Sequence, residues 1–142
     1  DNQYLLTLSG APDYSLMCWN WSKAKLMASA AVSTGSPMTR CSFSPIEPSM
    51  ACVTGKDSVK FFRITERDIR PVHDVQLEGH NFTCHVWLRQ PEDHIVAGTD
   101  NGDMVLFRAG EYVCHLACGP GHEMPIYSLI SVSHGLIAGS KA

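Results

Sequence analysis

The sequence has no apolar run near the 18 or more residues that a membrane-spanning helix needs, so we expect no membrane contact. It also lacks a basic excess, because 11 lysines and arginines stand against 14 aspartates and glutamates and the formal net charge is −3. Nucleic-acid binders usually carry a clustered basic face, so we expect no nucleic-acid partner. Residues 1–8 lack the basic start of a signal peptide, and the absence of an initiator methionine predicts a fragment of a longer protein.

Catalytic motifs are missing as well. There is no Gly-x-Ser-x-Gly, no phosphate loop ending in Gly-Lys and no His-Glu-x-x-His. The segment Gly98-Thr99-Asp100-Asn101-Gly102 has the composition of a hairpin turn, and no helical pattern follows it as a nucleotide loop requires. Acidic residues are scattered over turn-like segments. We therefore predict a protein that is not an enzyme and that needs no cofactor.

No Cys-x-x-Cys pair occurs among the six cysteines, which are Cys18, Cys41, Cys52, Cys84, Cys114 and Cys118. Most lie in apolar, strand-like runs, which predicts reduced thiols, with Cys41, Cys52 and Cys84 largely buried. The densest group of potential metal ligands is Cys114, His115, Cys118 and His122. In a strand, His115 and Cys114 point to opposite faces. We therefore expect no metal site there, but a strand that leads into the turn Gly119-Pro120-Gly121.

What the sequence does contain is an internal repeat. Three apolar runs end in an aromatic residue, namely Trp19, Phe62 and Phe107. These aromatic residues are 43 and 45 residues apart. Three predicted strands end in small residues that include a glycine, namely Gly55, Gly98 and Gly139. These glycines are 43 and 41 residues apart. A third pair, Phe43 and Trp87, is 44 residues apart. A period of about 40–45 residues is typical of β-propeller blades.

Each period holds four short apolar or alternating runs separated by polar turns, and no helical apolar stripe competes with them. The predicted strands are Arg40–Phe43, Met50–Thr54, Val59–Arg63 and His73–Leu77, then Thr83–Leu88, His94–Thr99, Met104–Phe107 and Tyr112–Leu116, then Ile126–Val132 and Leu136–Ser140. The fold class is all-β, a partial ring of about three four-stranded antiparallel blades. We place an incomplete blade at 1–30, blades at 38–78 and 81–117, and the start of a further blade at 124–142.

The order of these signals resembles the WD-repeat pattern. Gly79-His80 precedes a first strand, Trp19-Asn20 stands where the family has Trp-Asp, and Asp13 and Asp57 match its turn aspartate. Asn101 replaces that aspartate in the third unit, and Phe62 and Phe107 replace the tryptophan. The resemblance implies a hydrogen-bonded network of aspartate, histidine and tryptophan within each blade. The structural residues it assigns are Asp13, Trp19, Asp57, Phe62, His80, Asn101 and Phe107, and no blade has every part.

A narrower resemblance is to cilia- and flagella-associated WD-repeat proteins. It is carried by residues 4–28, with their Trp19-Asn20-Trp21 and Lys23-Ala24-Lys25, and by residues 52–107. It implies a non-catalytic axonemal adaptor that positions inner dynein arms or regulatory complexes on doublet microtubules. The expected partners are those axonemal proteins and the rest of its own propeller, and the expected location is the cytoskeleton of the cilium or flagellum. The alternative is a WD-repeat subunit of another assembly, such as intraflagellar transport, a ubiquitin ligase adaptor or a trafficking coat.

Two surface features accompany this interpretation. We expect one of Trp19 and Trp21 in the core and the other packed against a neighbouring sheet, with exposure to a partner as the alternative. Basic residues on turns and strand ends usually form a solvated rim, with partner binding as the alternative. They are Lys23, Lys25, Lys60, Arg63, Arg67 and Arg70.

Overall fold

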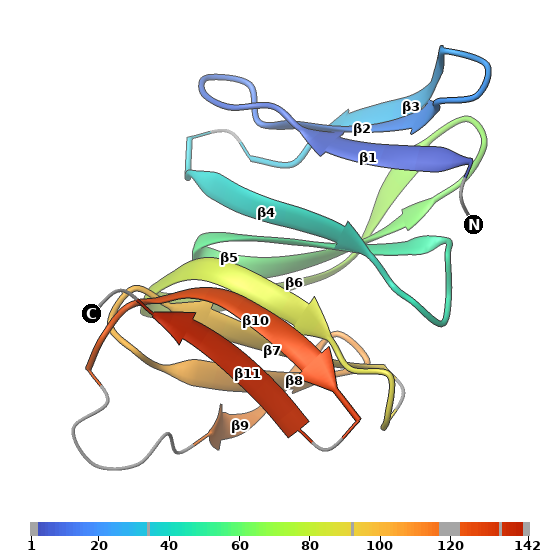
Figure 1. Ribbon diagram of the computed structural model, residues 1–142. Helices are drawn as coiled ribbons and strands as arrows, with labels where there is room; N and C mark the ends of the chain where they lie inside the picture. The colour runs from blue at the N-terminus through green and yellow to red at the C-terminus, as the bar shows by residue number, and fades with distance from the viewer. Residues whose placement is uncertain (1–2, 34, 92, 117–122, 134, 141–142) are drawn as a thin grey trace.

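The computed structural model describes residues 3–33, 35–91, 93–116, 123–133 and 135–140. In these ranges the chain forms β-strands and no helix, as Figure 1 shows. The strands are β1 (Tyr4–Leu8), β2 (Ser15–Asn20), β3 (Lys25–Ala31), β4 (Met38–Phe43), β5 (Met50–Ile64), β6 (Ile69–Trp87), β7 (His94–Thr99), β8 (Met104–Arg108), β9 (Glu111–Leu116), β10 (Ile126–Val132) and β11 (Gly135–Ser140). Nothing in the described ranges could cross a lipid bilayer as a helix.

Every strand pairing within the described ranges joins consecutive strands and is antiparallel, so the all-β prediction is confirmed. Strands β1–β3 form one sheet, β4–β9 a second, and β10 and β11 a third. In Figure 1 the blue N-terminal sheet and the red C-terminal hairpin lie at opposite ends, with the strands of the middle sheet between them.

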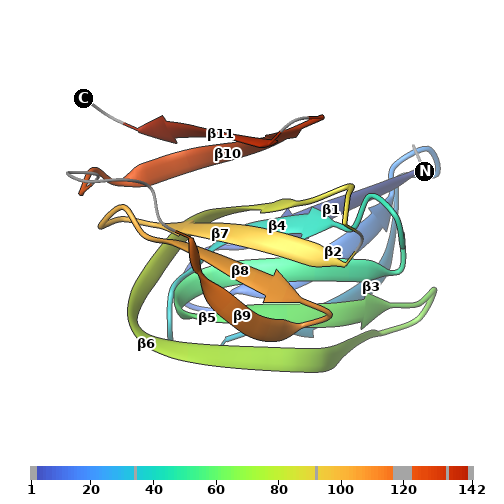
Figure 2. The ribbon, with the colours of Figure 1, turned by 90° about the horizontal axis from the view of Figure 1, so that it is seen from below.

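The long strands β5 and β6 each change direction. The N–H of Ile64 donates to the carbonyl of Ser49 at 2.7 Å, so the two ends of β5 lie side by side and the strand folds back as a hairpin. The reversal is at Asp57, whose φ of 62° is the left-handed conformation that aspartate tolerates in turns. Strand β6 pairs with β5 over residues 69–76 and again at Asn81, and it pairs with β7 from Phe82; its curve is visible in Figure 2.

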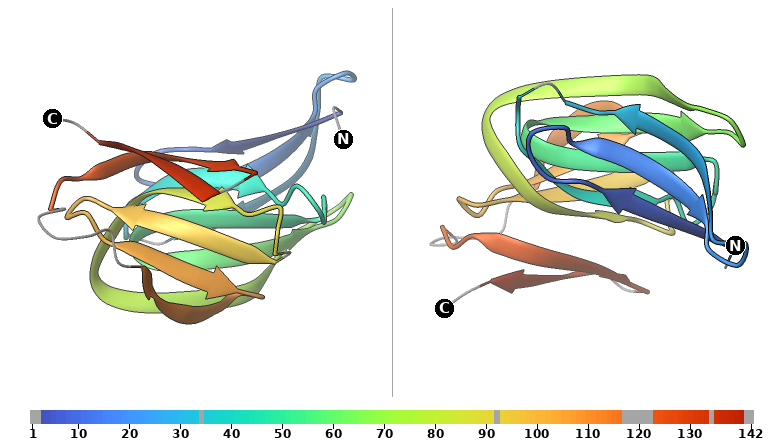
Figure 3. Two further views of the ribbon diagram at one scale, coloured as in Figure 1. Left: turned by 60° about the horizontal axis from the view of Figure 1, so that its bottom comes forward. Right: turned by 90° about the horizontal axis from the view of Figure 1, so that it is seen from above.

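The middle sheet therefore holds two four-stranded antiparallel meanders. We name four units in chain order. The first unit is β1–β3, the second is β4, both arms of β5 and β6 up to Gln76, the third is β6 from Phe82 with β7–β9, and the fourth is β10–β11. Figure 3 shows these units stacked on one another in two further views.

Irregular pairing recurs at the sequence period. The opening strand pair of the second, third and fourth units has a register shift between residues 38 and 40, 82 and 84, and 126 and 128, which are 44 residues apart. A second shift stands immediately before each aromatic marker, at Cys18/Trp19, Phe61/Phe62 and Leu106/Phe107. A bulge adds local twist to a strand, so the repeat is built into the backbone geometry as well as the composition.

The core lies between the units, because each inner sheet is covered on both faces. Residues 51–55 and 95–99 are buried without alternation, which is the pattern of strands with neighbours on both sides. Small residues at these strand ends have a steric reason. A Cβ atom added to Gly98 would lie 2.8 Å from Cγ2 of Ile126 in the next unit. The small-residue marker Gly98 therefore lies where another unit approaches the strand, whereas a Cβ added to Gly55 or Gly139 would meet Met38 or Ser128 of its own unit.

Candidate functional site

A hydroxyl joins the second unit to the third. Thr39 Oγ1 donates to the carbonyl of Phe82 at 2.9 Å, and it also lies 3.1 Å from the carbonyl of Thr54 in its own unit. The same arrangement recurs 44 residues later, where Thr83 Oγ1 contacts the carbonyls of Gly98 and Ile126. A side chain at the opening bulge of one unit thus holds the backbone of the next.

A polar network centred on His85 crosses the same junction. Its Nε2 lies 2.6 Å from Ser42 Oγ and its Nδ1 lies 2.8 Å from Thr54 Oγ1, and both partners belong to the second unit. The indole N–H of Trp87 donates to Ser42 Oγ at 3.0 Å. Trp87 also meets Phe61 edge to face at a ring distance of 6.0 Å. Polar groups in such a junction must be paired, so the network fixes one register between the units.

The imidazole of His85 is held neutral. Burial at the junction lowers its pKa from 6.5 to about 4, and the positive charge of Arg40 acts in the same direction. Since a neutral imidazole has one N–H donor and one acceptor, His85 can satisfy Ser42 and Thr54 at the same time. The role suggested by this geometry is structural. His85 was not among the predicted site residues, because in the sequence it is simply one residue of a strand.

The first unit contains two of the residues that the WD-repeat resemblance assigns to its network, Trp19 and Asp13. The indole N–H of Trp19 donates to Thr7 Oγ1 on the neighbouring strand at 3.0 Å. Asp13 is exposed in the turn between β1 and β2. Asn20, which replaces the family's aspartate, is buried, and its side-chain oxygen accepts from the hydroxyl of Ser22 at 2.9 Å and the N–H of Lys23 at 3.2 Å. Asn20 therefore shapes the turn that leads into β3.

The second unit contains a further residue that the WD-repeat resemblance assigns, the turn aspartate Asp57. Asp57 Oδ1 accepts from the backbone N–H of Gly79 at 2.9 Å, so the turn aspartate reaches the Gly-His dipeptide through the backbone. The imidazole of His80 is half-buried and stacks on Phe82 with a ring distance of 5.8 Å. Its Nδ1 lies 3.0 Å from the carbonyl of Glu78, and its Nε2 lies 2.9 Å from Nε2 of His115.

These contacts belong to a closed cycle of aromatic rings in the third unit. Each of its five rings lies within 6.4 Å of the next, and the members are His80, Phe82, Phe107, Tyr112 and His115. Phe107, one of the predicted structural residues, is fully buried at its centre. Tyr112 OH lies 2.8 Å from Nδ1 of His115. The cycle ties the outer strand β9 to the opening strand of the same unit.

The remaining predicted structural residues lie at two different places. Phe62 is 4% exposed and packs in a cluster with Leu16 and Val53, between the first and second units. Asn101 is exposed in the turn between β7 and β8, where it accepts from the hydroxyl of Thr99. The structure thus joins Trp19 to Thr7, Asp57 to Gly79 and His80 to Phe107 through Phe82, but it does not bring the seven residues together.

The described cysteines form no disulfide, and Cys18, Cys52 and Cys84 are buried. Cys41 is only half-buried, less than expected, and its sulfur lies 4.0 Å from the carbonyl of Leu6 in the first unit. Burial raises the pKa of the thiols of Cys52 and Cys84. Cys118 and His122 of the metal candidate, and the Gly119–Gly121 turn, lie outside the described residues. Within the described ranges, no three histidine, cysteine or acidic side chains form a metal-binding group.

Trp21 departs from the prediction that it packs against a neighbouring sheet. It follows the end of β2 in the turn to β3, and 58% of its surface is exposed. The reason is local. The Asn20 turn begins directly after the strand, so Trp21 is already outside the pleat that would orient it.

A search of curated proteins finds a relative. Cilia- and flagella-associated protein 57 of Mus musculus is 35% identical over 112 residues, which is 78% of this chain. The chain is homologous to a cilia- and flagella-associated protein. The match spans 9% of that relative's length, about a tenth, so the cilia- and flagella-associated relative is a far longer protein. No protein-family model matches the chain.

Proposed function

We propose that this chain is part of a WD-repeat β-propeller that acts as a non-catalytic protein-interaction scaffold in the axoneme. Its role would be an adaptor that positions inner dynein arms or regulatory complexes on doublet microtubules. The ciliary part of the proposal rests on the homology to a cilia- and flagella-associated protein. The propeller part rests on the stacked 44-residue units and on the exposed apolar faces of the first and fourth units.

The outer faces of the terminal units carry the observation that supports a larger ring. In the first unit, Leu5, Trp19 and Leu26 are cross-strand neighbours, and Leu5 and Leu26 are 51% and 42% exposed. The aromatic residues equivalent to Trp19 in the next two units, Phe62 and Phe107, are buried against the unit before them. Trp19 faces the side on which a preceding unit would lie.

The fourth unit also has an exposed apolar row on its outer face, at the other end of the stack. Ile130 and Ile137 are paired across β10 and β11 and are 56% and 55% exposed. In the third unit, Val86 pairs with Val96 in the corresponding place, and Val96 is fully buried under the fourth unit. Apolar rows of this kind are rarely left open in soluble proteins. Further units of the same polypeptide would cover both rows and close the ring.

The location can be tested in ciliated cells of the organism that encodes the protein. The endogenous gene is fused to a fluorescent protein, and axonemes are prepared after detergent extraction. The proposal predicts a signal along the axoneme that survives extraction, together with reduced amounts of inner dynein arm proteins when the gene is deleted. A signal that moves along the cilium and leaves with detergent would favour intraflagellar transport. A signal confined to the cell body would contradict an axonemal role.

A further inference from the structure

An apolar cleft lies between the first and second units. Its volume is about 240 Å³, and its walls are formed by Tyr4, Cys18 and Met27 of the first unit and by Phe43, Pro48 and Ile64 of the second. The cleft is at the end of the sheets where the β4–β5 loop and the β5–β6 turn emerge. Binding sites for side chains of a partner are usually concave and mostly apolar in this way.

A basic rim adjoins the cleft. A second hollow, of about 570 Å³, shares Tyr4, Met27 and Glu66 with it and adds three cationic side chains, which are Lys23, Lys25 and Arg67. Lys23 comes from the β2–β3 turn, Lys25 is the first residue of β3 and Arg67 comes from the β5–β6 turn, and all three are exposed. Three positive charges against the one carboxylate of Glu66 leave this rim positive, although the whole chain is negative.

The rim charges are not used within the part of the chain that the structure describes. Other cations on nearby strands form ion pairs, since Arg63 binds Glu47 at 3.0 Å and Arg70 binds Asp68 at 2.8 Å. No ion pair among the described residues involves the three cations of the rim. Their charge is therefore left available to a partner.

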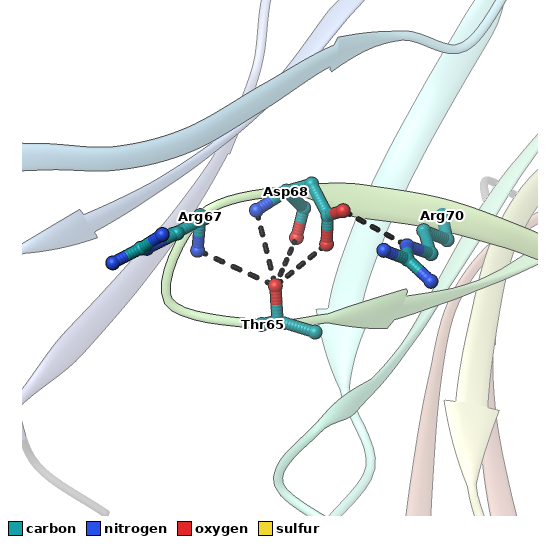
Figure 4. A network of polar contacts seen from close by, with 4 residues as sticks. All are labelled: Thr65, Arg67, Asp68 and Arg70. Atoms are coloured by element: carbon teal, nitrogen blue, oxygen red, sulfur yellow. Dashed lines mark hydrogen bonds and ion pairs between the residues drawn. The ribbon is translucent and has the colours of Figure 1, made fainter.

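The turn that carries Arg67 is internally ordered, as Figure 4 shows. Thr65 Oγ1 accepts from the backbone N–H of Arg67 at 3.3 Å and of Asp68 at 3.1 Å, and it lies 2.6 Å from the carboxylate of Asp68. The hydrogen bonds from Thr65 and then Arg70 lower the pKa of the Asp68 carboxyl. Because that carboxylate is held by Thr65 and Arg70, it does not neutralise Arg67, whose side chain extends away from the network in Figure 4.

We propose that this cleft binds an acidic peptide segment of a partner protein, with one bulky apolar side chain of the peptide in the cleft and its carboxylates on the basic rim. The apolar walls supply an anchor site, and the unpaired cations supply charge complementarity, which steers association and selects the partner. The proposal adds a partner surface to the proposed scaffold. It does not depend on ring closure or on ciliary location, because both walls belong to this chain.

The test measures fluorescence anisotropy with the full-length protein and a labelled peptide of glutamates around one central leucine. The first comparison peptide has serine in place of the leucine, the second has lysines in place of the glutamates, and a labelled single-stranded oligothymidine is the third probe. We expect the glutamate–leucine peptide to bind most tightly and to weaken as salt is raised, since the rim is exposed. An oligonucleotide that binds as tightly, or a serine peptide of equal affinity, would overturn the proposal.

Variants locate the binding. Lys25→Glu combined with Arg67→Glu should weaken binding at least about tenfold, because each change replaces an attractive charge with a repulsive one. The control is Lys56→Glu, which changes an exposed lysine at the opposite end of the β5 hairpin and should leave the affinity unchanged. Met27→Ser should weaken the leucine peptide more than the serine peptide, with circular dichroism confirming that each variant is folded. An equal effect of Lys56→Glu, or no effect of the rim double variant, would refute the site.

Discussion

The hydroxyl of Thr39 donates to the backbone carbonyl of Phe82 across the junction between two sheets, at 2.9 Å. The contact matters because it is repeated, with Thr83 contacting the carbonyl of Ile126 in the following junction. Each threonine lies at a bulge, where the extra residue is free of the regular ladder and its side chain can reach the next unit. One local irregularity therefore sets the stacking of successive units.

Removing the hydroxyls of Thr39 and Thr83 tests whether these contacts stabilise the stacking of the units. Thr39→Val and Thr83→Val keep the shape of the side chain but leave a carbonyl without its donor. Each should lower the free energy of unfolding by roughly 1 kcal/mol, the usual net contribution of such a hydrogen bond. Urea unfolding of both variants measures the loss, with Ser29→Ala on the exposed side of β3 as a control. Unchanged midpoints for both variants would mean that the junctions do not depend on these contacts.

The close approach at Gly98 makes a second prediction. Gly98→Ala would place a methyl group 2.8 Å from Cγ2 of Ile126 and 3.0 Å from Sγ of Cys84. Overpacking of this kind costs about 1–3 kcal/mol. Gly10→Ala is the matched control, because no atom lies within 4 Å of the added group. Thermal unfolding should separate the two variants, and equal stability would show that the fourth unit does not pack here.

The His85 network predicts a pH dependence. Its folded-state pKa is about 4 against an ordinary value of 6.5, so the folded protein binds fewer protons at this site than the unfolded chain. The contribution of the neutral His85 network to the free energy of unfolding is therefore fully present above about pH 6.5, and it is lost as the pH falls toward about 4. Subtracting the urea stability of His85→Gln from that of the wild type at each pH isolates this site. A difference that does not change over this window would contradict a neutral His85 at the junction.

The two tryptophans near the end of β2 should differ. Trp19 is half-buried and hydrogen-bonded to Thr7, whereas Trp21 is 58% exposed. In the full-length protein, where we propose that another unit covers Trp19, Trp19→Ala should cost about 3–5 kcal/mol, as for large aromatic residues in a core. Trp21→Ala should change the stability by less than about 0.5 kcal/mol, as is usual at exposed positions. Urea midpoints of the two variants provide the comparison, and a small effect of Trp19→Ala would show that its face is open in the whole protein.

The strands and the repeat could be predicted because they depend on local patterns. Apolar runs ending at Trp19, Phe62 and Phe107 are visible in the sequence, and the structure places a bulge before each of them. The strand predicted from His73 in fact begins at Ile69. Proline is a poor strand residue, and Pro71 lies in the part of β6 that pairs with β5 alone, beside the register shift at Phe61/Phe62.

The junctions could not be predicted, because their residues are distant in the sequence. Ser42 and His85 are 43 residues apart, and neither belongs to a motif. The same holds for the basic rim, where Lys23 and Arg67 meet only because two turns of adjacent units lie together. The aspartate, histidine and tryptophan network that the family resemblance implies stays a prediction, because the contacts made by its members are to other residues: Asp57 binds the backbone of Gly79 and His80 meets His115.

The proposed scaffold function requires that these units are part of a larger ring. A cryo-electron microscopy structure of the full-length protein tests this most directly. We expect further four-stranded units of the same polypeptide packed against the Leu5–Trp19–Leu26 row at one end and the Ile130–Ile137 row at the other, with both rows buried. Rows that remain open to solvent, or that are covered by helices, would contradict the propeller.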